Sequence, residues 1–137
     1  MGAVIVLADD DLDLRTIYAS VLRADGYEVV EACDGTETIA LAIEHRPALL
    51  LLDLWMPGVS GFEVLERLRY DPAMTITRVV ILSNLGDSDS RLEGFSEGVV
   101  DYWVKGLSLD DLRDRVRHVL EAAESTSEPF RADPRTP

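Results

Sequence analysis

Five short apolar runs recur along the chain, and segments with helical periodicity separate them. The runs are rich in leucine or β-branched residues and cover Ala3–Ala8, Glu28–Ala32, Ala48–Leu52, Arg78–Leu82 and Val99–Val104. Continuous apolar runs of this length are typical of strands that are buried on both faces of a sheet. Alternation of such strands with helices predicts an α/β fold with a parallel sheet and right-handed crossovers.

The segments between the runs predict helices of unequal strength. Apolar residues recur at helical spacing from Leu14 to Leu22, in Thr36–Glu44, from Phe62 to Leu68, and after Ser108 as far as Leu120. Gly26 is a plausible stop for the first helix, and the Ser108 hydroxyl can cap the last one. The segment Asp87–Glu97 has an acidic, serine-rich start and few apolar anchors, so we expect its helix to be the least stable.

The length and charge of the chain limit its class. Its 137 residues suit one domain, which we expect to span residues 1–121, followed by a flexible polar tail or linker stub over 122–137. A formal net charge of −13 opposes a polyphosphate backbone, so we expect no direct nucleic acid binding by this chain. Cys33 is the single cysteine, which excludes an intramolecular disulfide. No apolar stretch reaches the roughly 18 residues of a membrane span, and we expect a cytoplasmic protein.

Polar residues follow four of the five runs. Asp9, Asp10 and Asp11 follow the first run, Asp53 the third, Ser83 the fourth and Lys105 the fifth. Ligands of an open parallel sheet bind beyond the carboxyl ends of its strands. The sequence therefore predicts that carboxylates, a hydroxyl and an ammonium group meet at one edge of the sheet.

Such a set of groups suits a divalent cation and a phosphoryl group. Crowded carboxylates need a counter-charge, and an open pair of aspartates fits Mg²⁺ better than a closed calcium cage. A hydroxyl and a lysine opposite the metal would hold phosphoryl oxygens. Asp53 is then placed to act as a nucleophile that forms an aspartyl-phosphate. Asp11 and Asp13 favour the N-terminus of the following helix instead.

Four stretches, "VIVLADDD", "LLLLDLWMPGVSGFEVL", "VVILSN" and "DYWVK", resemble the motifs of receiver domains of two-component response regulators. The resemblance covers about Ala3 to Leu120. It implies a flavodoxin-like, doubly wound sheet of five parallel strands in the order 2-1-3-4-5, with helices on both faces. It also implies a signalling domain, not an enzyme for other substrates, which accepts a phosphoryl group from a sensor histidine kinase or a phosphotransfer protein.

The resemblance assigns the metal and acceptor residues by position. Asp53 matches the phosphoacceptor and a ligand of Mg²⁺. Asp10 matches a direct ligand, and Asp9 matches a residue that acts through water. The backbone carbonyl of Trp55 matches the remaining protein ligand.

The resemblance also assigns the residues that respond to phosphorylation. Ser83 and Lys105 match the hydroxyl and the lysine that contact the phosphoryl group, and Tyr102 matches an aromatic switch residue. Phosphorylation is expected to alter the surface formed by the predicted helix Asp87–Glu97, the strand Val99–Val104 and the helix that follows Ser108. That surface would serve a downstream protein partner, a missing effector domain or a phosphorylation-dependent homodimer.

The chain departs from the family pattern at three positions. Gly106 replaces the usual proline after the lysine, so we expect a trans or more mobile turn. Asn84 stands where the family more often has a small residue, and Trp55 is a bulky residue at a position where family members differ in their autodephosphorylation. Both are expected to prolong the phosphorylated state. Two alternatives remain: a pseudo-receiver that works by protein contact without phosphorylation, and a hydrolase of the haloacid-dehalogenase type. Structural or surface roles are expected for Cys33, His45 and His118.

Overall fold

The computed structural model describes residues 2–84 and 99–125, the last three as backbone only. The predicted helix Asp87–Glu97 and the segment 126–137 lie outside the described residues. The final helix continues to Ser125, which takes it four residues into the segment expected to be a tail.

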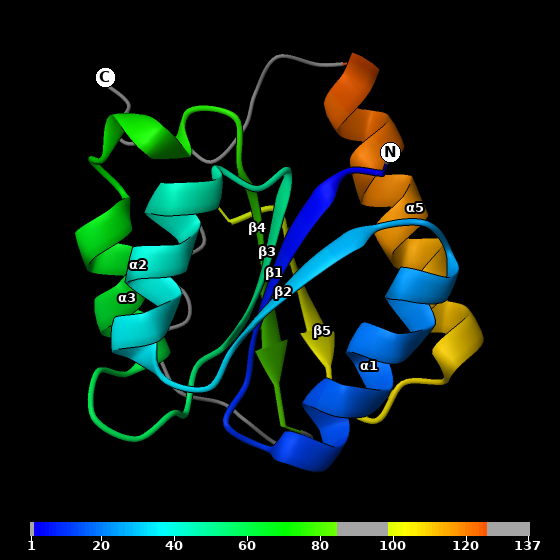
Figure 1. The fold of residues 1–137 in the computed structure, drawn as a ribbon, viewed down its shortest axis with the longest axis horizontal. Coiled ribbons are helices and arrows are strands. Elements are labelled where there is room, and N and C mark those ends of the chain that lie inside the picture. The colour runs from blue at the N-terminus through cyan, green and yellow to red at the C-terminus, as the bar shows by residue number, and fades with distance from the viewer. Residues whose placement is uncertain (1, 85–98, 126–137) are drawn as a thin grey trace.

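The sheet has the predicted topology. Five strands, all paired in parallel, lie in the order β2-β1-β3-β4-β5. Their bounds are β1 Val4–Ala8, β2 Glu28–Ala32, β3 Leu49–Asp53, β4 Arg78–Ser83 and β5 Asp101–Val104. The strand arrows point toward the lower edge of Figure 1, where the carboxyl ends lie together.

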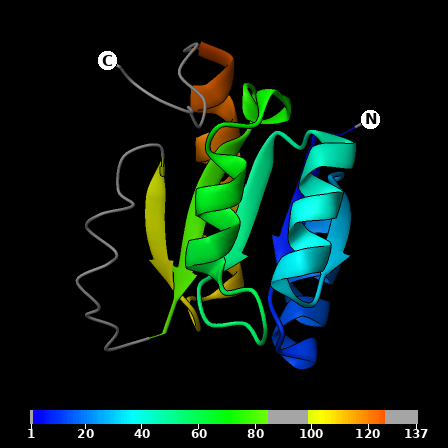
Figure 2. The same cartoon turned by 90° about the vertical axis from the view of Figure 1, so that its left-hand side faces the viewer.

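Helices cover both faces of the sheet, as the sequence predicts. The helical elements described are α1 Leu12–Ala24, α2 Gly35–His45, α3 Gly61–Leu68, the short 3-10 helix η1 Pro72–Met74 and α5 Leu109–Ser125. Figures 1 and 2 show α2 and α3 on one face and α1 and α5 on the other.

Alternation along each buried strand divides the core between the two faces. In β3, Leu50 and Leu52 pack with α2 and α3, whereas Leu49 and Leu51 pack with α1 and α5. All four are fully buried, because both faces of a parallel sheet are covered. This two-sided burial holds the strand ends in fixed positions.

Side-chain caps define where the helices begin. Asp11 precedes α1, and its carboxylate accepts a hydrogen bond from the Leu14 amide at 3.2 Å. Ser60 and Glu63 form a capping box at the start of α3. The Ser108 hydroxyl accepts from the Asp111 amide at 3.1 Å, as predicted for α5.

The link between α3 and β4 contains an element that the sequence analysis did not predict. Its first turn forms because the Asp71 carboxylate accepts from the Ala73 amide at 2.8 Å, and Pro72 suits the first helical position. Thr77 follows it, fully buried, and its hydroxyl donates to the Pro47 carbonyl at 2.6 Å.

Candidate functional site

Three predicted carboxylates meet at the carboxyl edge of the sheet. β1 and β3 are neighbours in register, with Ala8 opposite Leu52, so the residues that follow them are adjacent. Carboxylate oxygens of Asp9, Asp10 and Asp53 lie within 4.8 Å of one another. Asp9 and Asp53 are buried and Asp10 is exposed, so the group opens toward solvent on one side.

Lys105 bridges the two buried carboxylates. Its Nζ lies 3.1 Å from Asp9 Oδ2 and 3.1 Å from Asp53 Oδ1. The Lys105 amide donates to the Ser83 carbonyl at 2.7 Å, which continues the pairing of β5 with β4. No peptide bond in residues 2–84 and 99–125 is cis, so the turn with Gly106 is trans.

One carboxylate oxygen of Asp53 has no hydrogen-bond donor among the described residues. Asp53 Oδ1 accepts from the Trp55 amide at 3.1 Å in addition to its contact with Lys105. Within the described part of the chain, no donor reaches the buried Oδ2 of Asp53, and Asp9 Oδ2 has only its ion pair with Lys105. Buried carboxylate oxygens without donors are rare, and a hard cation is their natural partner. The donor set therefore fits Mg²⁺.

The surroundings of Asp53 raise its pKa. Burial contributes most and the nearby Asp9 carboxylate adds to it, while Lys105 and the Trp55 amide act in the opposite direction, so that the pKa of Asp53 rises to about 7. Burial lowers the pKa of Lys105, but Asp53 and Asp9 outweigh this and raise it overall. Lys105 thus stays charged between the Asp9 and Asp53 side chains.

Ser83 is the last residue of β4, and Tyr102 is the second residue of β5, opposite Ile81. The buried Ser83 hydroxyl donates to the Trp103 carbonyl across a long 3.5 Å. Tyr102 is half-buried and packs with the α2 and α3 side of the core, whereas Trp103 is buried on the other side. A bond of this length is weak, and Ser83 directly follows Leu82, which lies opposite Asp53 in the pairing of β4 with β3.

Trp55 and Asn84 are exposed residues that follow the carboxyl ends of β3 and β4. The Trp55 ring is 40% exposed and meets Phe62 edge to face, with centroids 5.4 Å apart. Asn84 is also exposed, directly after β4.

Two supporting residues were missed by the sequence analysis. Arg15 on α1 donates from Nη1 to the Asp9 carbonyl at 2.6 Å and pairs through Nε with Glu31 at 3.1 Å. At Gly61, an added Cβ would lie 2.5 Å from the Asp53 carbonyl oxygen, so only glycine lets α3 begin this close to the acceptor. Gly61, the second glycine of "MPGVSG", was a sequence signal for this close approach. Arg15 had no such signal, because its partners Asp9 and Glu31 come from β2 and the end of β1.

The side chains of the remaining predicted residues lie outside the group formed by Asp9, Asp10 and Asp53. Asp11 caps α1 and Asp13 lies in its first turn, as predicted. Cys33 is exposed beside Asp34, and His45 lies 3.9 Å from Glu44. His118 lines a groove between β5 and α5.

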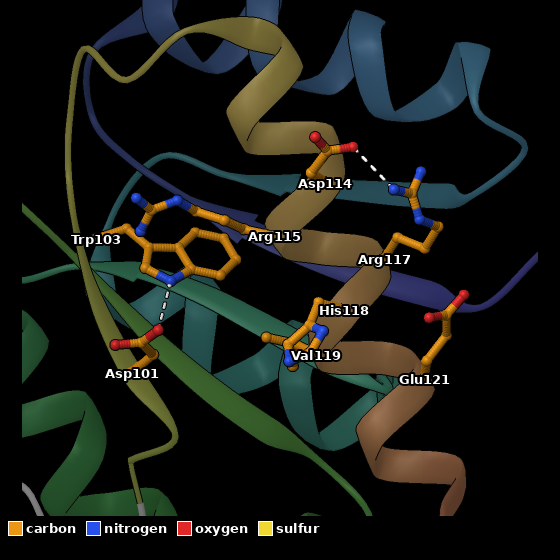
Figure 3. A pocket seen from close by; sticks show the side chains of 8 residues that line it. All are labelled: Asp101, Trp103, Asp114, Arg115, Arg117, His118, Val119 and Glu121. Atoms are coloured by element: carbon orange, nitrogen blue, oxygen red, sulfur yellow. Dashed lines mark hydrogen bonds and ion pairs between the residues drawn. The ribbon is translucent and has the colours of Figure 1, made fainter.

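That groove is a separate feature of the surface. Figure 3 shows Arg115 extended over Trp103, with the Trp103 indole N–H donating to Asp101 and Asp114 paired with Arg117. None of the predicted metal, acceptor or phosphoryl-contacting residues lines this groove. It lies on the side of the sheet covered by α5.

Among the described residues, no helix has the length and apolar character needed to cross a membrane.

Comparison with known families gives one consistent result. The family model described as "Response regulator receiver domain" matches residues 5–117. The chain is 35% identical over 120 residues to the DNA-binding dual master transcriptional regulator RpaA of Synechocystis sp., a match that covers 88% of this chain and 50% of that protein. It is 32% identical to the phosphate regulon transcriptional regulatory protein PhoB of Pseudomonas aeruginosa, covering 88% and 52% respectively. The chain thus spans about half the length of these curated relatives.

A solved structure agrees with the fold. A CheY-like response regulator receiver domain protein from Methanospirillum hungatei JF-1 is similar with a TM-score of 0.80 and 23% identity. The likeness covers 90% of this chain and 98% of that one. It concerns the fold alone, and it confirms the flavodoxin-like class predicted from the sequence.

Proposed function

The chain belongs to the response regulator receiver domain family, and we propose that it accepts a phosphoryl group on Asp53 in a Mg²⁺-dependent reaction. The observation that carries this proposal is the buried Oδ2 of Asp53, which has no hydrogen-bond donor among the described residues and lies beside two further aspartates and a lysine. Receiver domains are signalling domains, so the proposed chemistry is limited to the phosphorylation and dephosphorylation of the domain itself.

Asp53 would act as the nucleophile. One of its carboxylate oxygens forms the new bond to phosphorus while the bond from phosphorus to the donor's imidazole nitrogen or acyl oxygen breaks. The raised pKa of Asp53 means that a part of the apo protein is protonated near neutral pH. A cation at the site favours the ionised, nucleophilic form.

Each neighbour has a distinct part in this proposal. Asp10, Asp53 and the Trp55 carbonyl would hold Mg²⁺, with Asp9 acting through water. When bound, the metal neutralises charge on the phosphoryl oxygens. Lys105 is already within 3.1 Å of Asp53 and can pair with a phosphoryl oxygen after a small movement.

We further propose that phosphorylation is transmitted through Ser83 and Tyr102. Ser83 would exchange its long bond to the Trp103 carbonyl for one to the phosphoryl group. The space it leaves would admit the half-buried Tyr102 ring and alter the surface formed by the predicted helix Asp87–Glu97, β5 and α5. Substituting Tyr102 with alanine should preserve phosphorylation and weaken its structural effect, measured as amide exchange in β5 and α5.

Intact mass after treatment with acetyl phosphate tests the acceptor. With Mg²⁺ we expect one phosphoryl group on the wild type, none on Asp53→Asn, and none on the wild type in EDTA. Asp11→Asn is the matched control, because Asp11 is a helix cap beside the same site. Labelling that persists in Asp53→Asn would refute the proposal.

The same experiment tests the pseudo-receiver alternative, and an assay of phosphate ester turnover tests the hydrolase alternative. A pseudo-receiver would bind partners and take no phosphoryl group under any condition. A haloacid-dehalogenase-type hydrolase would turn over phosphate esters; those enzymes typically have a second aspartate two residues after the acceptor, where this chain has Trp55.

We propose that Trp55 and Asn84 slow the loss of phosphate by restricting water. Replacing both by alanine should shorten the half-life of the phosphorylated protein. Unchanged phosphate loss in the double variant would exclude this role.

The biological setting is also a proposal. Relatives named as transcriptional regulators are about twice as long as this chain. We propose that a receiver unit over residues 1–121 and the polar segment 122–137 work in the cytoplasm with a sensor histidine kinase or phosphotransfer protein, and with an effector domain, a downstream partner or a second copy.

A further inference from the structure

Tyr18 is a buried phenol on α1 whose hydroxyl reaches the turn after β5. Its side chain is 2% exposed and packs among the core residues shared by α1 and α5. The hydroxyl oxygen accepts a hydrogen bond from the Gly106 amide at 3.4 Å. Two segments that are 88 residues apart in sequence are thereby joined directly beside Lys105.

Within residues 2–84 and 99–125, the turn at Gly106 is loosely packed. Gly106 has a φ of +90°, and an added Cβ would meet no atom within 4 Å. A hollow lined by Tyr102, Val104, Lys105, Gly106, Leu107 and Arg115 lies against the turn. Close packing therefore does not fix the backbone at this residue, although Leu107 packs partly against the core beyond it.

We propose that Tyr18 is a positioning residue that holds the turn after β5 so that Lys105 spans Asp9 and Asp53. The Lys105 backbone is fixed on one side by its bond to Ser83 and on the other by the Tyr18 contact one residue later. The inference rests on the proposed function, since it assigns Lys105 its part in phosphoryl transfer.

The chemistry of the turn explains why a phenol suits this place. A proline at position 106 would have no N–H to donate, and its ring would not permit a φ of +90°. The chain has glycine there, which keeps its N–H donor and can adopt a positive φ. The Tyr18 hydroxyl on α1 accepts the hydrogen bond from that N–H. A phenylalanine would fill the same volume without that acceptor.

The test compares Tyr18→Phe with Tyr27→Phe, which removes a second, partly buried phenol packed against the same core cluster. Phosphorylation by acetyl phosphate is followed by intact mass, and Mg²⁺ affinity by tryptophan fluorescence. We expect Tyr18→Phe to slow phosphorylation about fivefold, the effect of one lost hydrogen bond, and to leave Mg²⁺ affinity within about twofold. Tyr27→Phe should change neither.

A second background shows whether Tyr18 acts through Lys105. In Lys105→Ala, the further change Tyr18→Phe should have no added effect on the rate. An undiminished effect in that background, or equal losses of Mg²⁺ affinity and rate, would overturn the proposal in favour of a general structural role.

NMR separates this inference from the proposed function. The Gly106 amide and Lys105 ammonium signals should shift in Tyr18→Phe even in unphosphorylated protein, and unchanged signals would overturn the inference. If wild-type protein takes no phosphoryl group, the proposed function fails, while the shifted signals would still support the positioning contact.

Discussion

The two edges of the sheet treat buried polar groups in opposite ways. At the amino edge, Thr77 is fully buried and its hydroxyl donates to the Pro47 carbonyl at 2.6 Å. At the carboxyl edge, Asp9 and Asp53 are equally buried. Asp9 Oδ2 has only its ion pair with Lys105, and Asp53 Oδ2 has no hydrogen-bond donor in the described part of the chain. Folding alone favours satisfied polar groups. A buried carboxylate oxygen without a donor therefore indicates that the carboxyl edge is a ligand site.

This difference between the two edges affects the free energy of unfolding. Burying a carboxylate beside another one disfavours the ionised form, which is why the pKa of Asp53 rises to about 7. The carboxyl edge therefore lowers the stability of the apo protein near neutral pH, and the rest of the sheet compensates for it.

The largest effect is expected from removal of the Asp53 charge. Its pKa is about 7 in the folded protein and about 4 when unfolded, so the folded state holds the proton more tightly, and the free energy of unfolding falls as pH rises through this interval. In EDTA, Asp53→Asn should match the wild type near pH 4 and exceed its stability by about 2–4 kcal/mol at pH 8. Urea denaturation at several pH values measures this difference. If the difference in stability between Asp53→Asn and the wild type does not change with pH, the carboxyl edge does not carry the proposed cost of a buried charge.

Magnesium should remove part of the same penalty. At a concentration one hundred times its dissociation constant, a ligand that binds only the folded state adds about 2.7 kcal/mol to the free energy of unfolding. We expect this gain for the wild type and its loss in Asp10→Asn, because Asp10 is exposed and has no part in the core. Asp13→Asn, on the exposed first turn of α1, is the control. Urea denaturation at constant ionic strength provides the measurement, and an equal gain in Asp10→Asn would show that the site lies elsewhere.

The fold was largely predictable because its signals are local. Continuous apolar runs predicted each described strand to within one or two residues, and β5 begins at Asp101, two residues after the predicted start. The order of the runs placed Asp9, Asp10 and Asp53 at one edge, since parallel strands end together. The short helix at Pro72–Met74 was missed because three residues carry no periodicity.

The supporting contacts of the site could not be predicted in this way. Tyr18 read as an ordinary member of the apolar face of α1, and only the folded chain shows its hydroxyl beside Gly106. Arg15 likewise needs the packing of α1 on β1 and β2 to meet Asp9 and Glu31. The raised pKa of Asp53 depends on burial and on distances between strands, which a sequence pattern does not contain.

At the amino edge, Thr77→Val should destabilise the protein without altering its chemistry. Valine nearly preserves the shape but leaves the Pro47 carbonyl without this donor, at a cost of about 1–3 kcal/mol. Thr77→Ser keeps the hydroxyl and should retain the hydrogen bond. Denaturation gives the stability, and labelling with acetyl phosphate should proceed at the wild-type rate in both variants. A slower rate in Thr77→Val alone would show that the two edges are coupled.

The smallest effect separates the cap from the metal site within one acidic run. Asp11 accepts from the Leu14 amide, and its own amide donates to Asp9 Oδ1 at 2.9 Å, so its carboxylate serves the helix while its backbone serves the site. Asp11→Ala should lower the free energy of unfolding by about 1 kcal/mol, and Asp11→Ser should recover most of it, because serine is also a good cap. Both should bind Mg²⁺ within about twofold of the wild type, after allowance for one lost surface charge. A much larger loss of Mg²⁺ affinity, shared by the serine variant, would place the Asp11 carboxylate in the metal site at the carboxyl edge, together with Asp9, Asp10 and Asp53.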